Sequence, residues 1–167
     1  MINNLQQLYQ DQLRDLYSAE TQLIAALPEM VSNSTDQDLK NAFSQHLEET
    51  REHRQRLGRI CADLNIDPSG EECEAMRGLI KEAKKHLAST APGDVRDAVL
   101  IASANRVEHY EIAAYGVAKA FADALGYDEA SNLLDKTLQE EGHADHTLTK
   151  IATGGLFSRG VNQEAIH

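Results

Sequence analysis

Four glutamates interrupt the apolar faces of four segments that have the composition of long helices: Glu20, Glu49, Glu111 and Glu141. The first two are equally far from the Ser34–Thr35 turn, and the last two are equally far from Gly126. In an antiparallel helix hairpin, residues equidistant from the turn lie at the same height. Each glutamate would then lie about 15 residues, or roughly 22 Å, from its turn. We expect the four carboxylates to converge near the middle of one bundle.

Further groups that bind metals accompany these glutamates. Glu108 and Asp145 form a second level beside the Glu111 and Glu141 pair, and the spacing leaves open whether Glu108 or Glu111 faces inward. Imidazoles lie one turn on either side of Glu49, at His46 and His53. Carboxylates gathered in a bundle core must either take up protons or bind cations, because they repel one another and lose hydration. The alternative for any single glutamate is a solvated surface position.

The donor set predicts a metal centre. Its expected ligands are Glu20, Glu49, His53, Glu108, Glu111, Glu141 and Asp145. Oxygen donors with one or two imidazoles suit iron, so we expect iron, with two ions per subunit as the fuller form and manganese or zinc as alternative metals.

The general di-iron carboxylate pattern uses Glu-x-x-His on two helices. Here the partners of Glu49 and Glu141 fall four residues on, at His53 and Asp145. Glu140 and His143 match the pattern literally, but on a face that fits the apolar stripe less well. His46, Glu140 and His143 therefore stay open as additional ligands. His109, His146 and His167 are expected at the surface or behind the ligands rather than as ligands, and no catalytic residue is assigned.

Five helices are needed to position these groups, and apolar periodicity predicts them at about 3–32, 36–65, 71–88, 94–125 and 128–153. Pro28 should kink or shorten the first helix. Ser34 with Gln37, and Ser69 with Glu72, have the spacing of capping boxes. Pro92 suits the first turn of the fourth helix, whose inner side is expected to begin at Val95, and Gly126 suits its C-terminal cap.

The element order predicts an all-α fold of one domain over residues 1–167. Two hairpins of long helices are joined by a crossover at about 66–93 that contains the short helix. One long crossover between two hairpins is the ferritin-like four-helix arrangement. Residues at about 154–167 are expected to form a loose tail or a short docking element.

Composition limits the partners. Sixteen Lys and Arg against 27 Asp and Glu give a formal net charge of −11. This balance opposes binding to nucleic acid and to anionic membranes. Apolar runs such as Ala98–Ala102 are far below the ~20 residues of a spanning helix, and no signal peptide is evident at the N-terminus. We expect a cytoplasmic protein with Cys61 and Cys73 as free thiols.

The same segments also carry a family resemblance. They are Leu16–Glu20, His46–Thr50, Cys73–Met76, Gly78–Ile80, Asp94–Ala98, Val107–Ala113 and Leu138–Glu141 with Asp145. Over about residues 5–152 the chain resembles the YciF/YciE-type bacterial stress-response family of the ferritin-like superfamily, and its YciF branch more closely. The resemblance implies a ferritin-like bundle that forms a homodimer, a stress-linked role and no settled activity. The inward carboxylates of such bundles correspond to Glu20, Glu49, Glu111 or Glu108, and Glu141. The second helix departs from the wider ferritin-like pattern because it lacks an inward Glu-x-x-His.

Two main hypotheses follow. The first is a di-metal carboxylate protein that reacts with a small oxidant, oxygen or peroxide, and whether it turns over as an enzyme is left open. The second is a non-enzymatic dimeric bundle that acts through protein contacts, with a vestigial or structural metal site. Storage in a ferritin-like cage is a weaker third reading, because nothing in the sequence specifies a cage.

Overall fold

The computed structural model describes residues 1–155 and 158–166, which form six helices and two very short strands. The helices are α1 (Leu5–Asn33), α2 (Gln37–Asp63), α3 (Glu74–Ala88), α4 (Asp94–Leu125), α5 (Asp128–Thr153) and α6 (Val161–Glu164). The strands are β1 (Gly154–Gly155) and β2 (Ser158–Arg159). The predicted long helices are therefore present, and the bounds of α4 and α5 agree with the prediction.

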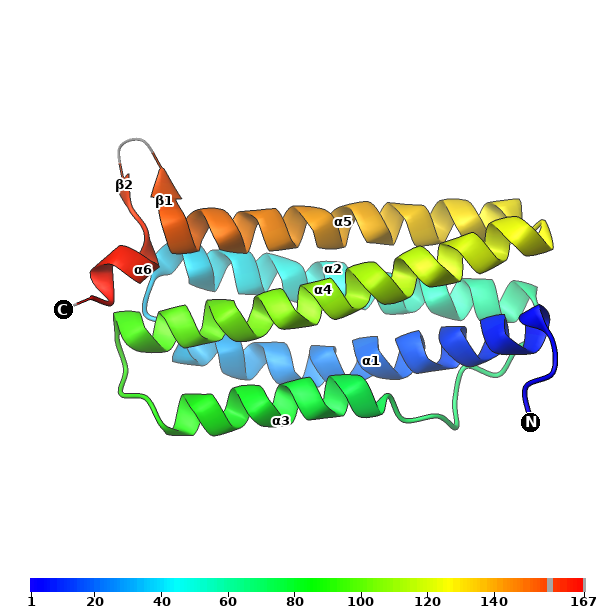
Figure 1. Cartoon of the computed structure of the whole chain (residues 1–167), viewed down its shortest axis with the longest axis horizontal. Coiled ribbons are helices and arrows are strands. Elements are labelled where there is room, and N and C mark those ends of the chain that lie inside the picture. The colour runs from blue at the N-terminus through cyan, green and yellow to red at the C-terminus, as the bar shows by residue number, and fades with distance from the viewer. Residues whose placement is uncertain (156–157, 167) are drawn as a thin grey trace.

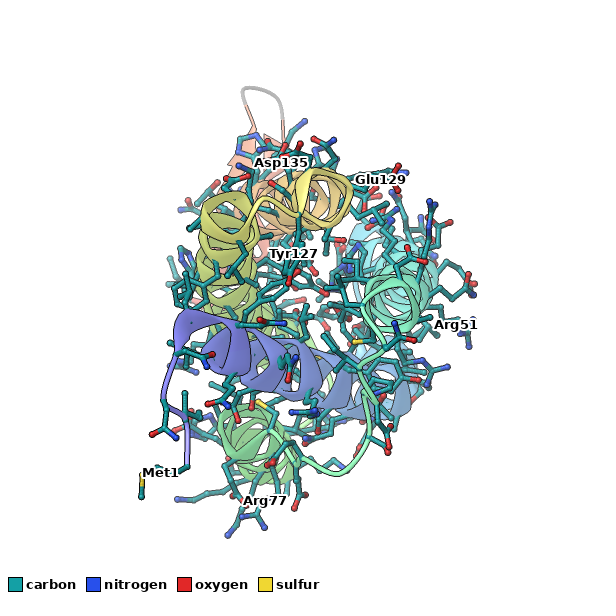
Figure 2. All side chains as sticks on the ribbon, turned by 90° about the vertical axis from the view of Figure 1, so that its right-hand side faces the viewer. Met1, Arg51, Arg77, Tyr127, Glu129 and Asp135 are labelled. Atoms are coloured by element: carbon teal, nitrogen blue, oxygen red, sulfur yellow. The ribbon has the colours of Figure 1, made fainter. Side chains whose placement is uncertain are left out.

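The four long helices form an all-α, ferritin-like bundle (Figure 1). The α1–α2 hairpin packs against the α4–α5 hairpin, so that α1 contacts α4 and α2 contacts α5. Residues 64–93 cross over along the length of the bundle and contain α3, which packs on the outside of α1 and α4 (Figures 1 and 2). The labelled Arg51 and Arg77 side chains in Figure 2 point away from the bundle, as expected for charged groups on its surface.

The turn between α1 and α2 differs from its prediction. The helix α1 continues through Pro28 to Asn33, so the proline does not end it early. The Ser34–Gln37 capping box does not form. Asp36 is the N-cap of α2 and accepts a hydrogen bond from the Leu39 N–H at 2.8 Å, while Ser34 donates to the carbonyl of Met30. Asp and Ser are comparable N-cap residues, and the bond of Ser34 to the preceding helix leaves Asp36 as the cap.

The short helix α3 also begins differently. Cys73 is its N-cap, and Ser69 instead donates to the carboxylate of Asp67, so the predicted Ser69–Glu72 cap is wrong. Gly93, at a φ of 128°, precedes α4, which places Pro92 before the first turn rather than within it. Gly126 caps the other end of α4 at a φ of 74°, as predicted for a left-handed position.

The apolar core is divided into two halves. One half contains Leu23, Phe43 and Leu100 near the α1–α2 turn. The other contains Leu13, Leu57 and Leu134 near the α4–α5 turn. Between the halves, the bundle interior is polar, which is the level that the spacing of the glutamates predicts.

The inner side of α4 is broader than predicted. Val95 is 53% exposed, so the expectation that the inner side begins there is wrong. The helix packs against α1, α3 and α5 at once. Its buried residues therefore cover more than one stripe, and a single periodicity cannot describe them.

The C-terminal segment docks on the bundle. β1 and β2 pair antiparallel, with Gly154 opposite Arg159, and α6 then contacts α4 and α5. A Cβ on Gly160 would lie 2.3 Å from the backbone nitrogen of Gly154, so only glycine fits there. The described part of this segment therefore contacts the bundle, and Leu156, Phe157 and His167 lie outside the described residues. Within the described chain, no helix is long and apolar enough to span a membrane.

Candidate metal centre

Six buried side chains meet in the polar level between the two halves of the core. They form two groups that share Glu141, namely Glu20, His53 and Glu141, and His46, Glu108, Glu111 and Glu141. In each group, one nitrogen or oxygen atom from every residue lies within 4.8 Å of the others. All four bundle helices contribute: α1 supplies Glu20, α2 both histidines, α4 Glu108 and Glu111, and α5 Glu141.

The first group is centred on His53. Its Nδ1 lies 2.9 Å from Oε1 of Glu141 and 3.6 Å from Oε1 of Glu20. The hydroxyl of Tyr115, which is fully buried, donates a hydrogen bond to Oε1 of Glu20. Oε2 of Glu20 has no hydrogen-bond partner. This group therefore presents one imidazole nitrogen and free carboxylate oxygens to a common volume.

The second group is centred on His46. Its Nε2 lies 3.3 Å from Oε1 of Glu108 and 3.9 Å from Oε2 of Glu141. Glu111 is fully buried, and neither of its carboxylate oxygens has a hydrogen-bond partner. Because Glu141 takes part in both groups, its two oxygens can serve one group each.

Unpartnered buried atoms concentrate in this centre. Among the described residues, twelve buried side-chain nitrogen and oxygen atoms lack a hydrogen-bond partner, and nine of them belong to these six side chains. Buried polar atoms are normally hydrogen-bonded, because an unpartnered one loses its hydration without compensation. Some of these atoms face one another as ion pairs, such as Nδ1 of His53 and Oε1 of Glu141, but both oxygens of Glu111 lack an ion pair as well as a hydrogen bond, so this carboxylate is free to bind a cation.

Burial and mutual repulsion disturb the protonation of the carboxylates. Burial, followed by the charge of Glu141, raises the pKa of Glu20 to about 8. Burial and neighbouring carboxylates also raise the pKa values of Glu108 and Glu111 well above normal. Burial would raise that of Glu141 too, but His53 and His46 outweigh it and lower the pKa. In the absence of a cation, these raised pKa values favour the protonated forms of Glu20, Glu108 and Glu111.

The pKa values of the two histidines are also raised, but by the neighbouring carboxylates rather than by burial. Burial disfavours the charged form of His46, but Glu108, Glu49 and Glu141 outweigh it and raise its pKa to about 10. Burial is likewise outweighed at His53, whose pKa is raised by Glu141 and Glu20. Imidazolium and carboxylate charges therefore compensate one another when no cation does so.

A second layer of side chains orients His53. Its Nε2 lies 2.9 Å from Oε2 of Glu140, and Arg56 holds both oxygens of that carboxylate. Arg56 also donates to the hydroxyl of Thr137 at 3.1 Å. A carboxylate on one ring nitrogen fixes the tautomer of a histidine and leaves the other nitrogen free to bind a metal. Nδ1 of His53, which faces Glu20 and Glu141, is then the free nitrogen.

Two of the expected ligands lie outside both groups. Glu49 is 29% exposed, accepts a hydrogen bond from Gln45 and lies 3.7 Å from Nδ1 of His46. Asp145 is 23% exposed and is held by Asn105 at 2.7 Å and by His109 at 3.3 Å. The expected ligands that do meet are Glu20, His53, Glu108, Glu111 and Glu141, so both candidates on α4 are buried rather than one of them.

The apolar pattern on α2 contains a signal that His46 faces inward, although His46 is not among the seven expected ligands. The buried residues Leu39, Phe43, His46, Thr50, His53 and Leu57 follow one another at spacings of four, three, four, three and four. Glu49 lies off this stripe, and both histidines lie on it. Of the other open candidates, Glu140 lies behind His53, and His143 is exposed. His109 and His146 are exposed, as predicted, and His167 lies outside the described residues.

The donor set fits a pair of hard or borderline divalent ions. Each group offers carboxylate oxygens and one imidazole, which is the chemistry preferred by iron, manganese and zinc. No cysteine takes part, since the described thiols, Cys61 and Cys73, lie in the apolar halves of the core.

Comparisons with known proteins agree with this fold. The family described as "Domain of unknown function (DUF892)" matches residues 4–166. Protein YciF of Escherichia coli (strain K12) is 41% identical over 152 residues, which cover 90% of this chain and 92% of that protein. The crystal structure of YciF, named there as a stress protein, matches with a TM-score of 0.86 over 89% of this chain and 94% of that one.

Two further solved structures match. YcfI from Rhodopseudomonas palustris is 41% identical, with a TM-score of 0.87 over 90% of this chain and 96% of that one. A protein from Xanthomonas campestris is 20% identical, with a TM-score of 0.70 over 88% of this chain and 89% of that one, and its likeness supports the fold alone.

Proposed function

The chain belongs to the family described as a domain of unknown function, DUF892, and from this premise we propose that it is a stress-associated, cytoplasmic, ferritin-like protein with a two-metal carboxylate centre. The proposed ligands are Glu20, His53, His46, Glu108, Glu111 and Glu141. Glu141 belongs to both groups, so it would be available to either ion. Iron is the first choice of metal, with manganese or zinc as alternatives.

The nine unpartnered buried atoms of the six side chains carry this proposal. Four carboxylates also balance the charge of two divalent cations. Without cations, the bundle must bury those groups through protonation and imidazolium formation, which leaves lone pairs unused. With cations, the same atoms become ligands, and the free energy of binding adds to that of folding.

Iron bound in such a centre would supply the electrons for reaction with a small oxidant, dioxygen or peroxide. The residues of this chain limit the access of bulk water, since all six residues are at most 6% exposed. Glu140 and Arg56 hold His53 in one orientation. The hydroxyl of Tyr115 donates to Glu20 and keeps one of its oxygens in place.

The test is anaerobic Fe(II) titration combined with elemental analysis of wild type, of Glu20→Ala with Glu141→Ala, and of Glu48→Gln. We expect about two ions per chain in wild type and stoichiometric binding to be lost in the double variant, which removes one unshared and one shared ligand. Glu48 is 68% exposed and pairs with Arg51, so its variant controls for charge and should bind normally. Unchanged metal content in the double variant would overturn the proposal.

The raised pKa values of Glu20, Glu108 and Glu111 favour a second candidate. A centre that holds protons can persist without metal, and the protein would then be a non-enzymatic homodimer that acts through protein contacts. This candidate expects a stable metal-free dimer by light scattering, whose melting temperature barely responds to Fe(II) or Mn(II). A rise of many degrees under saturating metal would count against it, because ligand binding stabilises by mass action.

A further inference from the structure

One surface pocket leads to the centre. It has a volume of about 110 Å³ and lies between α2, α4 and α5. At its outer side are Gln45 and His143, which are exposed, and at its inner side are His46 and Glu108, which are 6% and 2% exposed. We call this cavity the access pocket. It joins solvent to His46 and Glu108. Both ring nitrogens of His46 and Oε2 of Glu108 have no hydrogen-bond partner.

Glu49 lies on the wall of the access pocket, between solvent and the buried side chain of His46. It is 29% exposed, so its carboxylate is in contact with solvent, and its Oε2 is 3.7 Å from Nδ1 of His46. The other nitrogen of His46, Nε2, lies 3.3 Å from Glu108. Carboxylate, imidazole and carboxylate thus follow one another from the surface inward.

The side chains that line the pocket include groups that can bind cations. Its ionisable lining consists of Glu49, Glu108, His46 and His143, and the described residues that line it include no Lys or Arg. Glu49 is the most exposed carboxylate of this lining, and a negative charge near the mouth of a cavity attracts cations and raises their association rate. A neutral molecule such as dioxygen would gain nothing from this charge.

From this geometry we propose that the access pocket is the route by which divalent cations reach the centre, and that Glu49 is a transfer ligand that binds the incoming ion before His46 and Glu108 take it over. The inference rests on the proposed metal centre. It assigns Glu49 a role in the rate of loading, whereas the six buried side chains set the final occupancy.

The test is stopped-flow absorption with Co(II), whose visible bands report ligation, together with equilibrium titration of the same ion. Glu49→Gln should bind the same number of Co(II) ions as wild type, with the same final spectrum, but associate about tenfold more slowly. Glu48→Gln, which removes an exposed charge from the adjacent position, should load like wild type.

A steric variant tests the pocket independently of charge. Ala144 lines it, so Ala144→Leu should also slow loading without changing the final stoichiometry. The matched control is Ala113→Leu, at an exposed position of α4.

The outcomes separate the two proposals. Loss of a bound ion or a changed final spectrum in Glu49→Gln would make Glu49 a permanent ligand and overturn its transfer role. If Glu49→Gln and Ala144→Leu both bind Co(II) at the wild-type rate, the proposed route is wrong, while the metal centre itself is unaffected. Failure of wild type to bind Co(II), Fe(II) or Mn(II) would overturn the centre itself, and the route with it.

Discussion

Glu111 shows what a metal centre requires of a single residue. It is fully buried, both of its oxygens are unpartnered, and its neighbours include other carboxylates, which together raise its pKa. Each of these conditions destabilises the folded protein in the absence of a cation. A position of this kind is therefore better explained by ligand binding than by stability.

Replacing Glu111 by leucine should stabilise the metal-free protein. Two unpartnered buried oxygens are removed at similar volume, so the free energy of unfolding should rise by about 1–3 kcal/mol. Urea unfolding with a chelator present measures this change. In excess Mn(II) the sign should reverse, because the variant has lost a ligand. A metal-free variant that is less stable than wild type would contradict the prediction.

At the scale of elements, Asp97 connects the two hairpins. It lies in the first turn of α4, is 1% exposed, and accepts hydrogen bonds from the N–H groups of Thr35 and Asp36 at 2.8 Å each. These donors belong to the turn between α1 and α2. Asp97 thereby fixes the turn between α1 and α2 against the first turn of α4. This contact sets the height of the ligands on one hairpin relative to those on the other.

Replacing Asp97 by alanine should destabilise the bundle. Two backbone donors lose a charged acceptor, so the free energy of unfolding should fall by about 1–3 kcal/mol. Chemical denaturation of the metal-free protein measures the loss. Asp94→Ala is the control, because Asp94 lies in the same helical turn but is exposed. Equal losses in the two variants would assign the effect to the helix dipole rather than to the turn.

At the scale of the whole molecule, the polar level divides the core, and the two apolar halves must hold the bundle together around it. The centre links the stability of the entire fold to its protonation. Carboxylates with raised pKa values stabilise the folded state only while they are protonated. The formal charge of −11 thus overstates the charge of the metal-free folded protein near neutral pH.

The melting temperature of the metal-free protein should fall as the pH rises from about 6 to about 9. Glu20 has a folded pKa of about 8 against an ordinary 4.5, so the folded protein keeps a proton that the unfolded chain has lost, and stability falls through this interval. His46, at about 10 against an ordinary 6.5, acts in the same direction. The lowered pKa of Glu141 acts only at more acidic pH.

Saturating Mn(II) should counteract this loss. Metal binding requires deprotonated ligands, so the rise in melting temperature that Mn(II) produces should grow with pH. Thermal unfolding followed by circular dichroism, with chelator or with Mn(II), measures both curves. A metal-free melting temperature that climbs over the same interval would contradict the assigned protonation.

The sequence alone determined the helices and the height of the site. Apolar spacing defined the long helices, and equal distances from Ser34–Thr35 and Gly126 placed the carboxylates at mid-bundle, because backbone hydrogen bonding makes height a function of residue number. The composition and spacing of the glutamates also identified metal binding as the chemistry to expect.

Only the tertiary structure decided which side chains meet there. The spacing leaves Glu108 and Glu111 as alternatives, but α4 packs against α1, α3 and α5 at once and buries both. Glu49 and His46 are three residues apart on α2, and the packing of α2 against α1 and α5 brings His46 into the centre and leaves Glu49 at its edge. The facing of a side chain depends on the rotation of each helix against its neighbours. That rotation is set by contacts between residues far apart in the chain, which no local pattern contains.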